Sequence, residues 1–336
     1  MTVAVVVSNA ESGSLSVLAL DEGSGALSPL QTVALGGLLM PMALSPDGTR
    51  LFAARRSTPF AAVTLAVDRA TGRLDRVGEG PLPGSMAYVA TDRSGRWLLS
   101  ASYGDHVVAV SRIGDDGVVQ PAGQVRAAGA NAHAIVVDAS NRFAFSTSLG
   151  DGAVCQWRFD TAAGRLAPND PPRLALRQAA GPRHLVLHPG GRVAYLLNEL
   201  DATLDVLALD AARGTLAHAD TFAALPPGAT GAPWAADLHL RPDARFLYAS
   251  DRRSSLLAGF AVSRDGLGLV PIGHWPVPTQ PRGFAIAPGG DWLVVAGQAA
   301  DRVAAYAIDR DAGELSLRSE HPVGSGPNWV VAFALG

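Results

Sequence analysis

The sequence predicts an all-β fold, namely a seven-bladed β-propeller of four-stranded antiparallel blades. Three observations predict it. The 336 residues are rich in turn formers, with 37 Gly and 23 Pro. The apolar residues, 48% of the chain, fall in short strand-like runs that Gly and Pro interrupt too often for helices. Two turn signatures also alternate along the chain at the spacing of propeller blades, so we expect residues 1–336 to form a single domain.

The first turn signature is an acidic residue or an Arg-Asp pair, a short polar turn, a glycine and an apolar residue. Its glycines recur at intervals of roughly 45 to 52 residues, as expected for propeller blades. The seven copies have their glycines at Gly25, Gly72, Gly117, Gly164, Gly214, Gly266 and Gly313. Each copy is interpreted as the turn between the third and fourth strand of a blade.

The second turn signature marks the turn between the first and second strands, and it occurs only six times. The copies span residues 45–51, 92–97, 138–143, 188–193, 241–246 and 287–292. The missing seventh copy would fall at the chain ends, where residues 328–333 are typical of a first strand. Residues 2–7, 14–20 and 30–35 would then supply the second, third and fourth strands. The last blade is therefore predicted to be closed by one C-terminal and three N-terminal strands, which protects the sheet edges.

Composition excludes several classes of function. The formal net charge of −3 gives no electrostatic footprint for nucleic acid or an anionic membrane surface, and no apolar run approaches the ~18 residues of a membrane helix. All 27 basic residues are arginines, which excludes Schiff-base lysines and P-loops. The single cysteine, Cys155, is interpreted as core packing. Because the N-terminal residues resemble a strand rather than a signal peptide, we expect a cytoplasmic protein, and we expect a monomer.

The geometry of a blade predicts where a functional site would lie. Both turn signatures lie on one face, so the start of the first strand and the end of the second meet on the other face. Since the first strand is innermost, polar residues at its start surround the mouth of the central channel. In the hairpin of residues 181–199, Arg183 begins one strand and Glu199 follows the next. The sequence therefore predicts that Arg183 and Glu199 meet at this mouth.

Charged and polar residues at these positions concentrate on about four consecutive blades. The starts of first strands supply His133, Arg183, His184, Asp237, His239, Arg282 and Asn328, and the ends of second strands supply Arg55, Glu199, Arg252 and Gln298. Structural ion pairs between neighbouring strands are an alternative explanation for Arg183 with Glu199 and for Asp251 with Arg252. Chance is a weaker explanation for the convergence of so many polar residues on one mouth.

Several segments are similar to motifs of the seven-bladed lactonase family, which includes propeller-type 6-phosphogluconolactonases and carboxy-muconate cyclases. They are residues 181–184 with 198–200, residues 234–239 with 250–252, residues 279–284 with 296–298, and residues 324–329. The resemblance covers essentially the whole chain. It implies a site at the channel mouth, where His133, Arg183, Glu199 and Arg282 match the residues implicated in the cyclases. It also implies hydrolysis of a small anionic sugar-acid lactone without a cofactor.

Lactone opening needs an activated water and stabilisation of an oxyanion, which suggests roles for these residues. Glu199 is the expected general base, with His133 as the alternative base or as the acid that protonates the leaving alkoxide. Arg183 and Arg282 would polarise the carbonyl and hold anionic groups. The expected substrate-binding residues are Asp237, His239, Arg252, Arg55, His184, Gln298 and Asn328, and no metal site is expected.

We expect the substrate to be 6-phosphogluconolactone, hydrolysed to 6-phosphogluconate, and four alternatives stay open at the level of sequence. A phosphate could engage Arg55, Arg56 or Arg252, but the same arginines could instead bind the carboxylate of an unphosphorylated aldonic or aldaric lactone. The same scaffold could carry a muconate cycloisomerase or a propeller that only binds, because related propellers host different reactions. A calcium-dependent lactonase would use the oxygens of Glu199, Asp237 and Asp251, although the sequence has no compact ligand loop.

Overall fold

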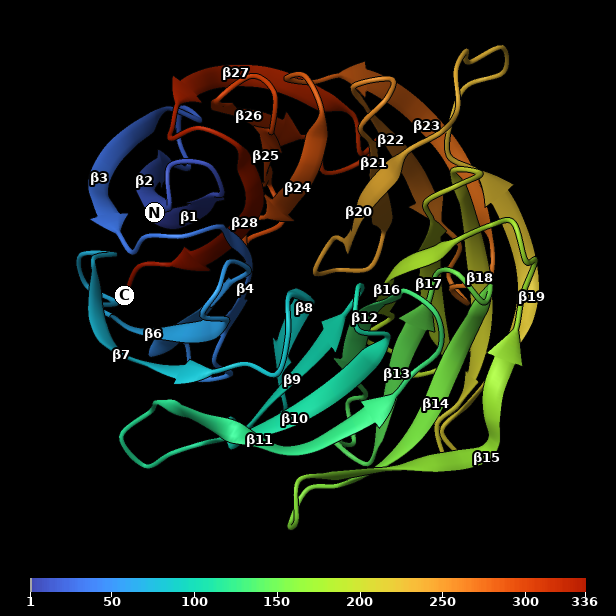
Figure 1. The fold of residues 1–336 in the computed structure, drawn as a ribbon. Helices are drawn as coiled ribbons and strands as arrows, with labels where there is room; N and C mark the ends of the chain where they lie inside the picture. The colour runs from blue at the N-terminus through green and yellow to red at the C-terminus, as the bar shows by residue number, and fades with distance from the viewer. Residues whose placement is uncertain (1) are drawn as a thin grey trace.

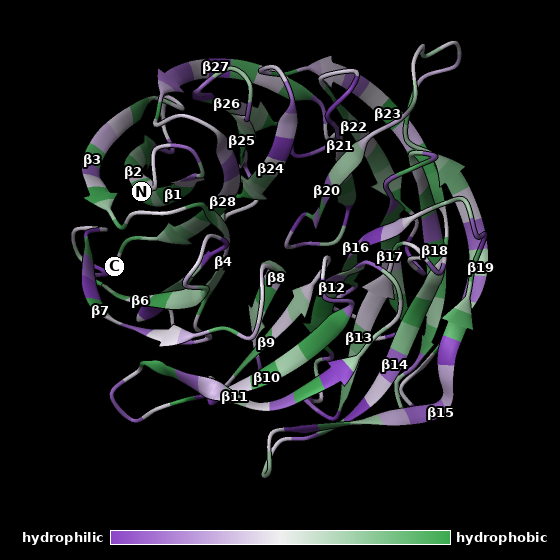
Figure 2. Ribbon diagram, in the orientation of Figure 1, coloured by the Kyte–Doolittle hydropathy of each residue, from purple (hydrophilic) through white to green (hydrophobic). Residues whose placement is uncertain are grey.

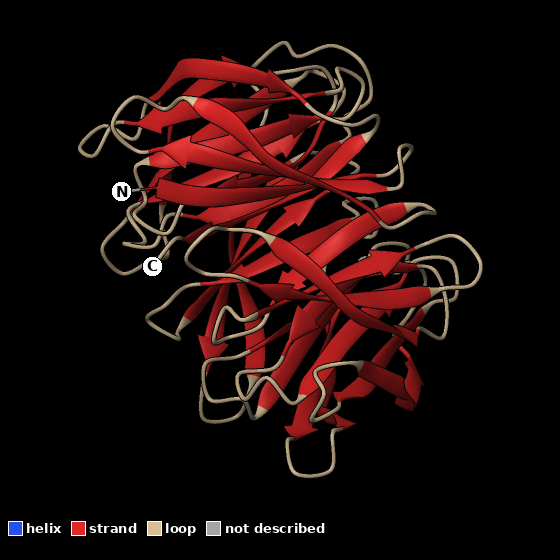
Figure 3. Ribbon diagram, turned by 90° about the vertical axis from the view of Figure 1, so that its left-hand side faces the viewer, coloured by secondary structure: helices blue, strands red, loops and turns tan. Residues whose placement is uncertain are grey.

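The computed structural model describes residues 2–336 as seven four-stranded antiparallel sheets arranged in a ring (Figure 1). These residues form 28 β-strands and no helix, as the view in Figure 3 also shows. The predicted all-β fold with seven blades is thereby confirmed. Within residues 2–336 there is accordingly no helix with the length and apolarity needed to cross a membrane.

The blades follow one another along the chain. The first three comprise β4 (Leu39–Leu44), β5 (Arg50–Arg55), β6 (Ala61–Val67) and β7 (Leu74–Pro81); β8 (Met86–Thr91), β9 (Trp97–Ser102), β10 (Val107–Ile113) and β11 (Val119–Ala127); and β12 (Ala132–Val137), β13 (Phe143–Ser148), β14 (Ala153–Asp160) and β15 (Arg165–Ala175). The next three comprise β16 (Pro182–Leu187), β17 (Val193–Asn198), β18 (Thr203–Asp210) and β19 (Thr215–Ala223); β20 (Ala235–Leu240), β21 (Phe246–Asp251), β22 (Leu256–Val262) and β23 (Leu269–Pro276); and β24 (Pro281–Ile286), β25 (Trp292–Gly297), β26 (Arg302–Ile308) and β27 (Leu315–Pro322).

The seventh blade joins the two ends of the chain. Its strand order is β28 (Pro327–Ala334), β1 (Thr2–Asn9), β2 (Ser14–Asp21) and β3 (Leu27–Ala34). The C-terminal strand β28 pairs with β1 along almost its whole length, from Val3 opposite Ala334 to Asn9 opposite Pro327. The predicted closure by one C-terminal and three N-terminal strands is confirmed, and it leaves β28 on the inside of the ring.

The apolar core lies mainly between neighbouring blades. In one cluster Tyr195 and Leu197 of β17 pack with Leu247 of β21, and all three side chains are buried. The first strands of successive blades contact one another around the axis, and the fourth strands lie at the rim. The rim strands are exposed to solvent on their outer side. Figure 2 shows that rim strands such as β7 and β15 are accordingly more hydrophilic than the inner strands beside them. Packing between blades therefore fixes the positions of the innermost strands.

A β-bulge interrupts the start of every innermost strand, including β28, where it falls at Asn328. At each bulge one more residue lies on the first strand than on its partner, which re-aims side chains near the channel mouth. The irregularities lie at residues 40–41, 87, 133–134, 183, 236–237, 282 and 328. Most of the polar residues predicted at strand starts thus occupy bulge positions.

Candidate active site

A cavity of about 190 Å³ lies at the channel mouth on the side of the bulges. Nine residues line it: Arg56, Ala87, Tyr103, His133, Arg183, Glu199, Trp234, Arg252 and Arg282. Four of them, Ala87, His133, Arg183 and Arg282, occupy bulges of innermost strands. Four others, Arg56, Tyr103, Glu199 and Arg252, are the first residues after the second strands β5, β9, β17 and β21. The cavity is therefore built from two equivalent positions of successive blades.

The hairpin of β16 and β17 brings Arg183 and Glu199 together. Pro182 lies opposite Asn198 and His184 lies opposite Leu197, so Arg183 is the additional residue of the bulge. A backbone hydrogen bond from the Glu199 amide to the Gly181 carbonyl, 2.7 Å long, closes the open end of this hairpin. The antiparallel pairing therefore places the two side chains at the same end of one blade, as the sequence predicted.

Glu199 is the one carboxylate among the nine residues that line the cavity. Its Oε2 atom accepts from Arg183 Nε at 2.7 Å and lies 3.1 Å from Arg252 Nη2. No hydrogen bond to Oε1 is found within residues 2–336, so this oxygen stays available to a bound molecule. Arg252 is itself fixed by the Trp234 and Ala235 carbonyls and stacks on the Trp234 ring at 3.9 Å. Glu199 is thus oriented by two guanidinium groups that cannot easily move.

Two arginines of the cavity have no carboxylate partner. The Arg56 guanidinium donates to Ser85 Oγ at 3.0 Å and to Met40 Sδ at 3.1 Å, and the Arg282 side chain makes no hydrogen bond or ion pair with any described residue. Burial, followed by the nearby Arg183 guanidinium, lowers the pKa of Arg56, and the same two causes lower the pKa of Arg282 to about 9. Burial and Arg183 likewise lower the pKa of Arg252 to about 8. This cluster of cations is electrostatically unfavourable until an anion enters it.

His133 lies in the wall of the cavity with only 4% of its surface exposed. Its ring packs against those of His184 at 5.2 Å and Tyr103 at 6.1 Å, and its Nδ1 atom has no hydrogen-bond partner among the described residues. Burial, and then the charge of Arg183, hold the pKa of His133 well below its usual value. The imidazole is therefore neutral at neutral pH, which suits it to accept a proton rather than to donate one.

Three of the predicted residues form a hydrogen-bonded chain beside the cavity instead of lining it. His184 and Asp237 are buried, with their Nδ1 and Oδ1 atoms 2.8 Å apart, and His184 Nε2 lies 3.0 Å from Arg183 Nη1. His239 Nε2 reaches Asp237 Oδ2 at 3.2 Å, and His239 borders a second cavity along the channel. His184 and Asp237 do not line the cavity, so this placement gives no support to direct binding of substrate by them and agrees better with an orienting role.

Three further predicted residues are not brought to the cavity. Arg55 is the last residue of β5 and makes two 3.0 Å hydrogen bonds to Glu79, so its place at the mouth is taken by Arg56. The Oε1 atom of Gln298 accepts from Gln280 at 3.2 Å. Asn328 is fully buried, and its amide donates to the carbonyls of residues 8, 39 and 326.

Tyr103 and Trp234 were not predicted as site residues. Tyr103 stands directly after β9, at the position that Glu199 and Arg252 occupy in their blades, so its place in the repeat could have identified it. Trp234 precedes β20, and the sequence analysis gave it no role in the site. Its position under the Arg252 guanidinium depends on a contact between two segments that no local pattern encodes.

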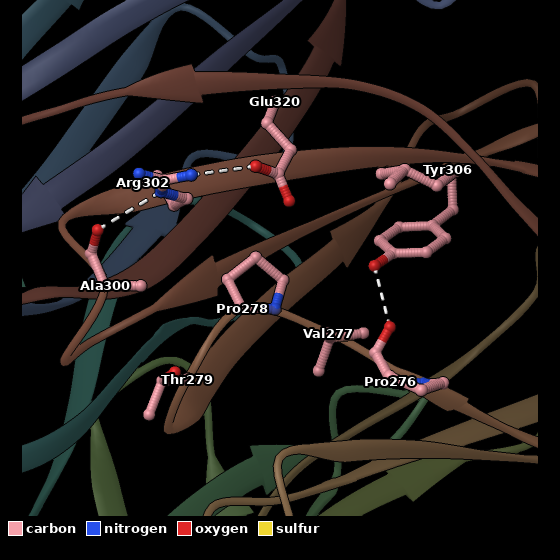
Figure 4. Close-up of a pocket in the computed structure, with 9 residues that line it drawn as sticks. Pro276, Val277, Pro278, Thr279, Ala300, Arg302, Tyr306 and Glu320 are labelled. Atoms are coloured by element: carbon pink, nitrogen blue, oxygen red, sulfur yellow. Dashed lines mark hydrogen bonds and ion pairs between the residues drawn. The ribbon is translucent and has the colours of Figure 1, made fainter.

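A larger groove at the outside of the ring lacks this excess of unpaired charge. The groove in Figure 4, of about 420 Å³, lies beside β26 and β27 and the segment that follows β23. Its charged pair, Arg302 and Glu320, is 3.0 Å apart, and Tyr306 donates to the Pro276 carbonyl. Among residues 2–336 no group of three or more His, Cys, Asp and Glu side chains is arranged to hold a metal ion. The mouth cavity is therefore the best candidate for an active site.

Comparisons with known proteins agree with this architecture. The family model for lactonases with a 7-bladed β-propeller matches residues 2–332. Proteins named 6-phosphogluconolactonase from Pectobacterium carotovorum and Serratia proteamaculans are 39% and 38% identical to the chain over 331 residues, which cover 98% of each sequence. The solved periplasmic gluconolactonase of Pseudomonas aeruginosa is 28% identical, covers 100% of both chains and superposes with a TM-score of 0.93.

Proposed function

The chain belongs to the lactonase family of seven-bladed β-propellers, and we propose that it hydrolyses 6-phosphogluconolactone to 6-phosphogluconate. The observation that carries this proposal is the charge of the mouth cavity. Four arginines line it against one carboxylate, and two of the four have no carboxylate partner. A dianionic phosphate supplies the missing negative charge, whereas a neutral sugar lactone would leave Arg56 and Arg282 uncompensated.

The arrangement of Glu199 and the arginines supports a direct attack of water on the lactone. Glu199 Oε1 takes a proton from the water as its oxygen bonds to the carbonyl carbon, and Arg183 and Arg282 stabilise the resulting oxyanion. Collapse of this intermediate breaks the bond between the carbonyl carbon and the ring oxygen. The proton passes to the leaving alkoxide, so one water is consumed and Glu199 returns to its carboxylate form.

His133 is the second candidate for the base. Its neutral imidazole lies in the same cavity, and the low pKa that burial imposes keeps it unprotonated at neutral pH. Glu199 is preferred because a carboxylate oxygen without a hydrogen-bond partner is open to the cavity, while the Nδ1 atom of His133 is buried. Arg56 follows β5 and lies on a different blade from His133 on β12 and Glu199 after β17, and we assign it to the phosphate.

We also propose that the protein acts as a cytoplasmic monomer. All nine residues of the cavity come from one chain, so no partner subunit is needed to complete it. A phosphorylated substrate and a buried, unpaired Cys155 both suit the reducing cytoplasm. Size-exclusion chromatography with light scattering and cell fractionation test these two statements. A stable dimer or a periplasmic fraction would contradict the corresponding one.

The activity itself is tested with purified protein and freshly made 6-phosphoglucono-δ-lactone, alongside glucono-δ-lactone and a galactaro-lactone, with a chelator present. The spontaneous hydrolysis of each lactone is subtracted. Because charge-assisted hydrogen bonds contribute about 1.5–3 kcal/mol each, we expect kcat/KM for the phosphorylated lactone to be roughly a hundredfold higher than for the others. A preference for the galactaro-lactone would mean that the arginines bind a carboxylate of the substrate and not a phosphate. If the protein accelerates the hydrolysis of none of the lactones, the proposed function is overturned.

A further inference from the structure

Most of the hydrogen-bonding capacity of Arg183 is used inside the protein. A guanidinium group has five N–H donors in a fixed plane. In Arg183, Nε donates to Glu199 Oε2, and Nη1 donates to both His184 Nε2 and the Ala236 carbonyl. Nη2 makes no hydrogen bond with any residue in the range 2–336. Since Arg183 lines the cavity, Nη2 is the pair of donors left to meet a substrate.

Asp237 determines which nitrogen of His184 faces Arg183. Its Oδ1 atom lies 2.8 Å from His184 Nδ1 and accepts from the Leu238 amide at 2.9 Å, and its Oδ2 atom accepts from the Phe284 amide at 3.0 Å. An ionised carboxylate only accepts hydrogen bonds, so Nδ1 must carry the hydrogen. The lone pair of His184 is then on Nε2, 3.0 Å from Arg183 Nη1.

The charge states of the pair agree with this geometry. Burial, followed by the positive charge of Arg183, lowers the pKa of His184 to about 4, so the ring is neutral at neutral pH. Although burial alone would raise it, the pKa of the Asp237 carboxyl lies well below its usual value, because His239 and His184 stabilise the carboxylate. A neutral histidine that accepts from Arg183 is possible only with this combination of states.

We propose that His184 and Asp237 are a positioning pair that holds the Arg183 guanidinium in the one orientation that presents Nη2 to the lactone carbonyl. Neither residue lines the cavity, and each has no more than 5% of its surface exposed, so they act through Arg183 and not on the substrate. This inference rests on the proposed lactonase function. Without the pair, the guanidinium would keep Glu199 at Nε but only the Ala236 carbonyl at Nη1, so Nη2 would be held less firmly at the position where the oxyanion forms.

The variants His184→Phe and His184→Gln separate positioning from packing. Phenylalanine keeps the ring contacts of His184 with Tyr88, His133 and Trp329 but removes the acceptor for Arg183. Glutamine offers a carbonyl oxygen that can accept from Nη1. We expect kcat for the preferred lactone to fall by roughly 10²-fold in His184→Phe with KM within about threefold, and glutamine to restore most of the loss. The matched control His188→Gln, at the turn after β16, should retain wild-type kinetics.

The outcomes distinguish this inference from the proposed function. An active wild type with a kcat for His184→Phe within about threefold of it, or no recovery in His184→Gln, would overturn the positioning role alone. An inactive wild type would overturn the lactonase function and the inference with it.

A second measurement does not depend on the folding of His184→Phe. In wild-type protein, ¹⁵N spectra of labelled histidine should show His184 neutral with hydrogen on Nδ1 from pH 5.5 to 7.5, the signal being assigned by its loss in His184→Gln. A cationic ring, or hydrogen on Nε2, would exclude acceptance from Arg183 and overturn the proposal.

Discussion

At the scale of single residues, Glu199 combines two tasks in one carboxylate, because Oε2 pairs with Arg183 and Arg252 while Oε1 stays open. If Oε1 is the general base, Glu199→Gln should lower kcat by roughly 10²- to 10⁴-fold, because an amide cannot take the proton. The measurement is steady-state hydrolysis of 6-phosphogluconolactone, with circular dichroism to verify the fold. Loss of this partly buried carboxylate also removes the charge partner of the Arg183 and Arg252 guanidinium groups, so a lower melting temperature is expected.

The matched control for this substitution is Glu320→Gln, which removes a carboxylate from the exposed pair with Arg302 and should leave kcat unchanged. His133→Gln tests the alternative base in the same assay. A folded Glu199→Gln protein with near-normal turnover, together with an inactive His133→Gln protein, would transfer the role of base to His133.

Arg56 should determine the preference for a phosphorylated substrate. Its guanidinium is held by Ser85 and Met40 and has no carboxylate partner, so Arg56→Gln removes a charge that only the substrate neutralises. We expect KM for 6-phosphogluconolactone to rise at least tenfold, because a charge-assisted hydrogen bond contributes about 1.5–3 kcal/mol. Hydrolysis of glucono-δ-lactone should change less than threefold.

The neighbouring residue supplies the control for this prediction. Arg55→Gln removes an arginine that is already paired with Glu79 outside the cavity, so both lactones should be hydrolysed as by the wild type. An equal effect of Arg56→Gln on the two lactones would show that Arg56 does not contact the phosphate.

Arg55 and Arg56 also show how far sequence reasoning reaches at this scale. The repeat identified the right end of β5, and the same reasoning placed Arg183, Glu199, Arg252 and Arg282 correctly beside the cavity. It could not say which of two adjacent arginines turns inward, because that depends on the residue at which the strand ends. Nor could it distinguish a side chain that lines the cavity from one, like His184, that lies behind it.

At the scale of elements, the bulges of the innermost strands explain why site residues cluster as they do. A bulge places two residues opposite one and changes the direction of its side chains. Such an irregularity leaves no clear sequence signal, because it follows from the pairing of two strands. Gly283 is one local trace: a Cβ there would lie 2.5 Å from the Asn328 carbonyl oxygen, so only glycine lets β24 approach β28 beside Arg282.

Asn328 occupies the bulge of β28 and is expected to hold strands together rather than to bind substrate. Its amide donates to the Ser8, Leu39 and Gly326 carbonyls, which join β28 to β1 and β4. Asn328→Ala removes these three hydrogen bonds from buried carbonyls, of which the Gly326 carbonyl still accepts from the Ala10 amide. The free energy of unfolding should therefore fall by about 3 kcal/mol, while kcat/KM stays within threefold. Urea unfolding and lactone kinetics measure the two effects.

Asn169→Ala is the control, because the Asn169 amide also donates to backbone carbonyls, two in number, but lies at the exposed rim. This substitution should lower the free energy of unfolding by less than about 1 kcal/mol. A stable Asn328→Ala protein with impaired turnover would assign Asn328 to the substrate site, as its position in the sequence predicts.

At the scale of the whole molecule, the ring and its closure were predictable where the site details were not. Seven copies of one turn and six of the other define the blades, and the missing copy requires the ends of the chain to share a blade, which β28 and β1 do. Closure also explains the buried polar groups at the mouth. Seven innermost strands converge there. Histidines and carboxylates at the starts of these strands are therefore shielded from solvent, and the charge of each affects its neighbours.

The stability of the whole ring should therefore depend on pH through these buried histidines. Burial lowers the pKa of His184 to about 4 and that of His133 well below its usual value, whereas in the unfolded chain both remain near 6.5. Between these values the unfolded state binds more protons, so stability is complete above about pH 6.5 and falls as the pH decreases toward 4. For His184 alone the free energy of unfolding should fall by about 2 kcal/mol from pH 7 to pH 5.

Urea unfolding at a series of pH values measures this dependence of the free energy of unfolding on pH. His184→Phe should make the dependence weaker, whatever the stability of the variant at pH 7. Parallel curves for the two proteins would mean that His184 is protonated to the same extent in the folded and unfolded states, contrary to its burial beside Arg183.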